Sequence, residues 1–173
     1  MPLVLSGDGA VGPLSATEVS YLDGVTSAVQ TQINGKYTTG GAWSAYTPTL
    51  TASTTNPTLG TGSTTSGFYA QIGKIVIGYF IVQFGTSGVN AGSGTYYVSL
   101  PVTAASSSSP VVGSVDLADA STGARATGVA TQVTASTIQF EYDGGTYQGA
   151  MHNAPWAWAA SDSIRVQFTY EAA

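Results

Sequence analysis

The segment 75–84 leaves no polar face. Both its odd and its even positions carry large apolar side chains, namely Ile75, Val76, Ile77, Tyr79, Phe80, Ile81, Val82 and Phe84. Successive side chains of a β-strand point to opposite faces, so this strand needs an apolar environment on both sides. In a single small β-sandwich, one face of the sheet should be in water. The simplest arrangement buries one face in the domain core and the other against neighbouring subunits.

Few charges oppose such an association. Only 8% of the 173 residues are charged, where about a quarter is typical of soluble proteins. Copies of the chain can therefore associate without desolvating many ions. The net charge is −5 and the four basic residues are widely scattered. We therefore expect no nucleic-acid partner, because a phosphate backbone needs a basic patch.

Cysteine and targeting signals are both lacking. Without cysteine there is no disulfide framework and no thiolate metal site, so stability must come from packing and assembly. The opening MPLVL has no basic flank and no long apolar run. We expect neither a signal peptide nor membrane insertion, and a protein made in the cytoplasm.

Residues 13–36 carry helical signals. Ser15 and Glu18 have the spacing of a capping box. Helices this short are marginal in water, so we expect three copies to pack around an axis as a stalk. The alternative is that the helix packs on the β domain of its own chain. The apolar stripe that would mediate either contact is Val19, Leu22, Val29 and Ile33.

Residues 37–42 have the composition of a linker, and residues 43–173 alternate between strand and turn patterns. Strands are expected at 67–71, 75–84, 95–100, 111–115, 137–142 and 163–170. The segments 118–127 and 144–162 are expected to be loops. The predicted fold is mainly β: a short N-terminal helical stalk (1–42) and an antiparallel, jelly-roll-like β-sandwich head (43–173), assembled as a homotrimer.

Two stretches resemble proteins of tailed bacteriophages. The segment LSATEVSYLDGVTSAVQTQINGK is similar to a repeat of phage tail-fibre proteins. From Trp43, WSAYTPTLTASTTNPTLGTGSTTSGFYAQIGKIVIGYF resembles the C-terminal module of phage minor tail proteins, and the ending WAASDSIRVQFTYEAA fits that module too. The resemblance implies a virion component of the phage tail, commonly trimeric, that contacts other tail proteins and a bacterial surface. It supplies no binding residues.

Aromatic and polar residues gather between positions 142 and 158. Flat aromatic faces beside amide and carboxylate groups are typical of sugar-binding sites, so we expect adhesion to a bacterial surface polysaccharide. The tryptophans fit packing on the head or on a neighbouring subunit equally well. A purely structural tail-tip or baseplate protein without host contact is the alternative function. The candidate glycan-binding residues are Tyr142, Asp143, Tyr147, His152, Asn153, Trp156 and Trp158.

The sequence gives no clear catalytic or metal-binding motif. The sole histidine, His152, has no serine elbow around it. Glu141 and Asp143 face the same way on one strand, as a glycosidase pair would, but a solvated strand end explains them better. Asp116 and Asp119 lack the spacing of a calcium loop. We therefore expect a protein that is not an enzyme, with no cofactor and no metal.

Overall fold

The computed structural model describes residues 41–105, 110–143 and 147–173, together with Thr17, Thr31 and Gly35. The chain divides into two units, Met1–Thr39 and Gly40–Ala173. The predicted stalk positions Val19, Leu22, Val29 and Ile33 lie outside the described residues. No helix in the described part of the chain is long and apolar enough to cross a bilayer.

The described residues of the second unit form ten β-strands, and the expectation of a mainly β fold is confirmed. All of their pairings are antiparallel. The strands are β1 (Ser44–Tyr46), β2 (Leu50–Ala52), β3 (Thr64–Ile72), β4 (Ile75–Gln83), β5 (Tyr96–Ser99), β6 (Val111–Ala118), β7 (Arg125–Thr134), β8 (Thr137–Asp143), β9 (Tyr147–Gly149) and β10 (Ser163–Glu171).

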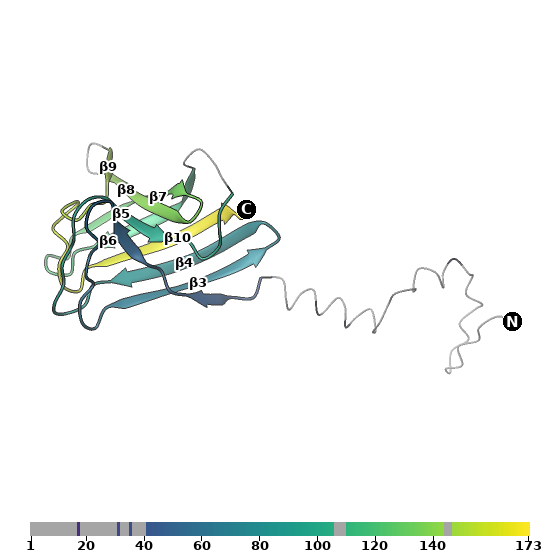
Figure 1. Cartoon of the computed structure of the whole chain (residues 1–173), viewed down its shortest axis with the longest axis horizontal. Helices are drawn as coiled ribbons and strands as arrows, with labels where there is room; N and C mark the ends of the chain where they lie inside the picture. The colour runs from purple at the N-terminus through teal and green to yellow at the C-terminus, as the bar shows by residue number, and fades with distance from the viewer. Residues whose placement is uncertain (1–16, 18–30, 32–34, 36–40, 106–109, 144–146) are drawn as a thin grey trace. The chain divides into compact units, whose positions relative to one another are not determined.

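The strands form one curled sheet in the order β1-β3-β4-β10-β6-β7-β8-β5-β2, with β9 on β8. Strands β4 and β8 are four places apart, which is about 19 Å in a flat sheet. Yet the rings of Phe80 on β4 and Phe140 on β8 lie only 6.4 Å apart, centroid to centroid. The sheet therefore curls until its two halves face each other, and Figure 1 shows β7 and β8 opposite β3 and β4. The jelly-roll connection and the homotrimer stay predictions.

The core fills the space between the two halves of the sheet. Strand β10 alternates as the sequence predicts: Ile164, Val166, Phe168 and Tyr170 are buried, and the residues between them point outward. Its neighbours in the sheet supply partners for this row, with Val76, Phe80 and Val82 from β4 and Leu117 from β6. Each buried side chain of this size contributes roughly 1.5–3 kcal/mol, so the four residues of this row stabilise the domain substantially.

Glycine makes room for aromatic rings inside the curl. A Cβ added at Gly67 would lie 2.3 Å from Cε1 of Tyr46, and one at Gly78 would lie 2.4 Å from Cζ of Phe168. Real carbon atoms do not approach so closely, so these two rings pack directly on the backbone of β3 and β4. Glycine is therefore required at positions 67 and 78 because the aromatic rings leave no room for a side chain, and not because the backbone turns there.

Some strands differ from the sequence prediction. Residues 125–127 begin β7, and residues 147–149 form β9, although both segments were expected to be loops. In β7 most side chains other than Val129 and Val133 are small or polar, so its alternation carries little hydrophobic signal. The strands expected at 137–142 and 163–170 are confirmed, as is the hairpin, whose arms are β3 and β4.

Candidate functional site

The outward-facing side chains of β3, β4, β10, β6 and β7 form one surface, which we call the outer face. Directly paired residues of antiparallel strands point to the same side of a sheet, so the register gives rows across this face. One row is Ser66, Ile81, Arg165, Asp116 and Thr127. The next is Phe68, Tyr79, Gln167 and Ser114, followed by Ala70, Ile77 and Thr169, and then by Ile72, Ile75 and Glu171.

The end of the outer face near the β3–β4 turn is apolar, and we call it the apolar half. Its six side chains are between 37% and 60% exposed. At about 150–250 Å² per side chain, they present a patch of roughly 600 Å². Patches of this size often mark interaction surfaces. The six are Trp43, Phe68, Ile72, Ile75, Ile77 and Tyr79.

Ring contacts hold the aromatic part of this surface together. The Tyr79 ring lies 5.5 Å from that of Trp43 and 5.8 Å from that of Phe68, centroid to centroid. Strand β4 thus carries apolar side chains on both sides, as the sequence predicts, with Val76 and Phe80 inside the core. The outward side of β4 is exposed in the single chain. Burial of that side by a neighbouring subunit stays a prediction.

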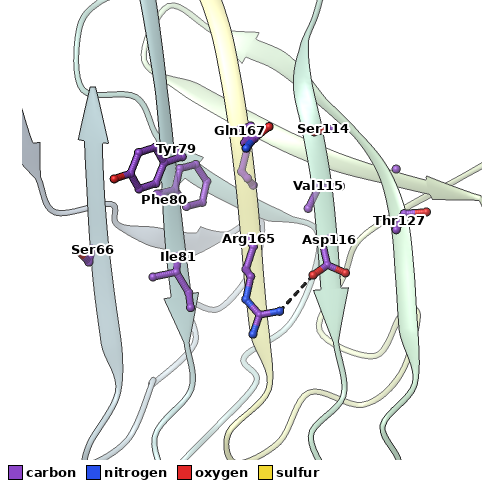
Figure 2. A pocket seen from close by; sticks show the side chains of 12 residues that line it. Ser66, Tyr79, Phe80, Ile81, Ser114, Val115, Asp116, Thr127, Arg165 and Gln167 are labelled. Atoms are coloured by element: carbon purple, nitrogen blue, oxygen red, sulfur yellow. Dashed lines mark hydrogen bonds and ion pairs between the residues drawn. The ribbon is translucent and has the colours of Figure 1, made fainter. Parts of the chain in front are cut away.

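The opposite end of the outer face is hollowed. Polar groups line it beside apolar side chains, and we call it the polar hollow after the former. Its volume is about 540 Å³. Figure 2 shows Arg165 and Gln167 of β10 between Tyr79 and Ile81 of β4 on one side and the short polar side chains of β6 and β7 on the other. The lining side chains at the rim and floor include Ser66, Ser114, Asp116 and Thr127.

A second hollow of about 500 Å³ continues toward Trp43. The two hollows share Tyr79, Gln167 and Ser114, so they form one groove along β10. One wall of this groove is apolar, and the other carries hydroxyl and carboxylate groups. A groove of this kind can hold an elongated ligand by ring contacts on one side and hydrogen bonds on the other.

Two arginines meet one aspartate beside the polar hollow: Arg165 and Asp116 line the hollow, and Arg125 lies outside its lining. The Nη1 atoms of Arg165 and Arg125 both donate to Oδ2 of Asp116, with 3.1 Å between Arg165 and that oxygen. The exposed fraction of the side chain is 46% for Arg165, 54% for Arg125 and 33% for Asp116. Arg125 and Arg165 also line a neighbouring depression with Asp119, so the two arginines are matched there by two carboxylates. These two arginines are half of the four basic residues of the chain.

The predicted glycan-binding segment contains two buried aromatic rings. Trp158 is 4% exposed and Tyr142 is 7% exposed. The Trp158 ring packs between Phe84 and Tyr96, at centroid distances of 5.7 and 5.8 Å. Its indole N–H donates to the carbonyl of Met151, at 2.9 Å. Both rings therefore belong to the core and have no exposed face for a sugar.

The other predicted glycan-binding residues are more accessible or are not described. His152 is half-buried, and its Nδ1 accepts a hydrogen bond from the Gly94 amide at 3.0 Å. Asn153 is exposed, and Trp156 packs beside Trp158 at 5.6 Å. Asp143 and Tyr147 are paired in the β8–β9 hairpin, and their side chains lie outside what is described. The glycan-binding role of the segment stays a prediction.

The carboxylates considered for chemistry have structural partners. Glu141 accepts hydrogen bonds from Thr131 and Gln139, both at 2.8 Å. Asp119 accepts hydrogen bonds from the side chains of Thr122 and Ser121, which lower its pKa to about 2. Among the described residues, no three His, Cys, Asp or Glu side chains lie together as metal ligands would.

Sequence reasoning did not identify the groove. It predicted the strands at 75–84 and 163–170, but not that they are neighbours in the sheet, as the pairing of Tyr79 with Gln167 shows. The pairing of β4 with β10 joins residues about ninety positions apart in the sequence. A local sequence pattern cannot predict such a pairing. Comparison of the chain with protein-family models, curated proteins and solved structures finds no match.

Proposed function

We propose that the chain is a homotrimeric tail protein of a tailed bacteriophage, without enzymatic activity, whose β domain attaches the virion to a bacterial surface polysaccharide. The observation that carries the proposal is the apolar half of the outer face. A monomer that stayed in water would leave this patch of roughly 600 Å² exposed. The phage context comes from the resemblance of segments 14–36 and 43–80 to tail proteins.

A second copy of the chain is the occupant that best fits the apolar half. Stable interfaces cover about 800 Å² on each partner, which is close to the area of the patch. The apolar half also lies where the chain enters the domain, since a Cβ at Gly41 would lie 3.2 Å from Cδ1 of Ile72. Three chains joined through their N-terminal segments would bring three such surfaces together.

Multivalent adhesion follows from this assembly. Three weak sites on one trimer act together because binding at one site raises the effective concentration at the others. Each site then needs only a modest affinity for the virion to stay on the cell. Other tail proteins would hold the trimer on the particle, through residues 1–42 by analogy with the resembling repeat.

The alternative is a structural tail-tip or baseplate protein that never contacts the host. One observation favours it: Tyr142 and Trp158, two of the predicted sugar-binding residues, are buried in the core. In that case the outer face would contact only other proteins of the virion. Both functions share the homotrimer, so they differ only in cell binding.

The test combines molar mass with cell binding. The full chain is passed through size exclusion with light scattering, and a mass three times 17.5 kDa is the expected result. The labelled protein is then mixed with a panel of bacteria with different surface polysaccharides. Retention on some strains and not on others supports adhesion. A trimer that binds no strain supports the structural alternative, and a monomer at micromolar concentration contradicts the assembly itself.

A further inference from the structure

We propose that the polar hollow binds an acidic sugar, a pyranose ring that carries a carboxylate. This inference rests on the adhesive function proposed above and names its ligand class and its site. Arg165 would receive the carboxylate, and the Tyr79 ring would pack against the face of the sugar. Gln167, Ser114 and Thr127 would form hydrogen bonds with its hydroxyl groups.

The unused N–H donors of Arg165 point to an anion. Asp116 accepts from both arginines through a single oxygen, Oδ2. A guanidinium group has five N–H donors in a planar fork that matches a carboxylate, and only one nitrogen of each arginine is used by Asp116. Both side chains are about half exposed, so a ligand can reach them.

The aromatic ring and the size of the hollow point to a sugar rather than to a simple ion. Tyr79 is 46% exposed and lines the hollow directly beside Gln167, its cross-strand partner. The volume of about 540 Å³ lies within the range of small-ligand sites. A phosphate or sulfate ion would leave most of this space, and the ring itself, unused.

The site and the proposed subunit contact can coexist on one face. Ile81, in the row of Arg165, is six residues along β4 from Ile75, which is about 20 Å in an extended strand. Tyr79 is the one residue that the apolar half shares with the lining of the hollow. A trimer held by the isoleucines at the hairpin end would leave the arginine end of the groove open.

The experiment titrates the full chain with three acidic oligosaccharides by isothermal calorimetry: trigalacturonate, trimannuronate and a hyaluronan tetrasaccharide. We expect at least one to bind, and its fully methyl-esterified form, which lacks the charge, to bind at least tenfold more weakly. Arg165→Gln should weaken binding at least tenfold as well. Lys74→Gln removes the same charge from the exposed β3–β4 turn and is the matched control, with unchanged affinity expected.

A second pair of measurements tests the role of the ring. Tyr79→Leu keeps an apolar side chain for the subunit contact and removes the aromatic face, so it should weaken sugar binding while the molar mass stays unchanged. Polyglycerol phosphate serves as an anion without a sugar ring. If it binds as tightly as the best oligosaccharide and Tyr79→Leu has no effect, the hollow is a general anion site and the proposal is overturned.

Failure of this site can be distinguished from failure of the function. If the wild-type trimer adheres to cells but none of the three oligosaccharides binds, or if Arg165→Gln adheres equally well, the polar hollow is not the site while adhesion stands. If Arg165→Gln, folded by circular dichroism, changes the molar mass, the hollow is a subunit contact and the proposal is overturned. If the wild type neither adheres nor binds, both proposals fail.

Discussion

The double substitution Ile75→Ser and Ile77→Ser tests whether a neighbouring subunit covers the apolar half. The two side chains are 59% and 45% exposed in the single chain, so about half of each remains to be buried. Full burial of an isoleucine contributes roughly 1.5–3 kcal/mol, so a neighbour that covers the exposed halves gains about 0.8–1.5 kcal/mol from each. The pair together would contribute about 2–3 kcal/mol per subunit.

This energy corresponds to a weakening of subunit association by roughly 30- to 150-fold, since each 1.4 kcal/mol is a factor of ten. Sedimentation velocity over a concentration series measures it as a shift of the trimer-to-monomer transition to higher concentration. Val133→Ser is the control, because Val133 is 41% exposed and lies on β7, away from the apolar half. Thermal unfolding monitored by circular dichroism shows whether the variants remain folded.

Two outcomes would refute the reasoning. In the first, the double variant assembles over the same concentration range as the wild type, so that no neighbour covers these side chains. In the second, Val133→Ser dissociates the assembly as strongly, so that the effect does not depend on position. In either case the outward side of β4 would need another explanation.

Three further predictions concern the stability of the domain. The Tyr46 hydroxyl is buried and has no hydrogen-bond partner among the described residues; Tyr46→Phe should therefore raise the free energy of unfolding by about 1 kcal/mol in urea titrations, and an equal loss would contradict this. Hydrogen bonds, that of the Thr122 hydroxyl first among them, lower the pKa of Asp119 from 3.8 to about 2. The folded state thus favours the carboxylate, and its stabilising effect is complete above pH 4 and lost as the pH falls toward 2; the melting temperatures of wild type and Asp119→Asn should converge over this range. Gly78→Ala places a methyl group 2.4 Å from Cζ of Phe168 and 2.6 Å from the backbone carbonyl oxygen of Phe68. It should cost about 1–3 kcal/mol, while an unchanged melting temperature would show that both the ring and the β3 backbone shift without cost.

The sequence predicted the elements with a strong apolar pattern. Strand β10 carries large apolar residues at every second position and β4 carries them at nearly every position. The bounds expected for β10 and for the β3–β4 hairpin agree with the structure to within a few residues. Strand β7 was missed because its inward positions include Ala126, Gly128 and Ala130, which hardly differ in hydropathy from their neighbours. Strands β1, β2 and β9 have three residues each, too few for a periodic pattern.

The candidate site depended on information that a single sequence does not hold. An aromatic residue in a loop segment can point into the core or into solvent, and composition does not distinguish Trp158, which is buried, from Trp43, which is exposed. The polar hollow depends on long-range pairing, because Asp116 and Arg165 face each other only when β6 and β10 are neighbours. Such pairings follow from the closure of the whole sheet, and they become visible only in the folded chain.

The position of β10 in the sheet also determines when the domain can fold relative to its synthesis. This strand is the last of the ten in chain order, yet it lies between β4 and β6 and pairs with both along most of its length. Until residue 171 has emerged, β4 and β6 present open edges and the sheet cannot close. Pairings between such distant segments form slowly. Folding is therefore confined to the time after synthesis of the domain, and chains that stop early lack the groove and present no complete outer face to other subunits.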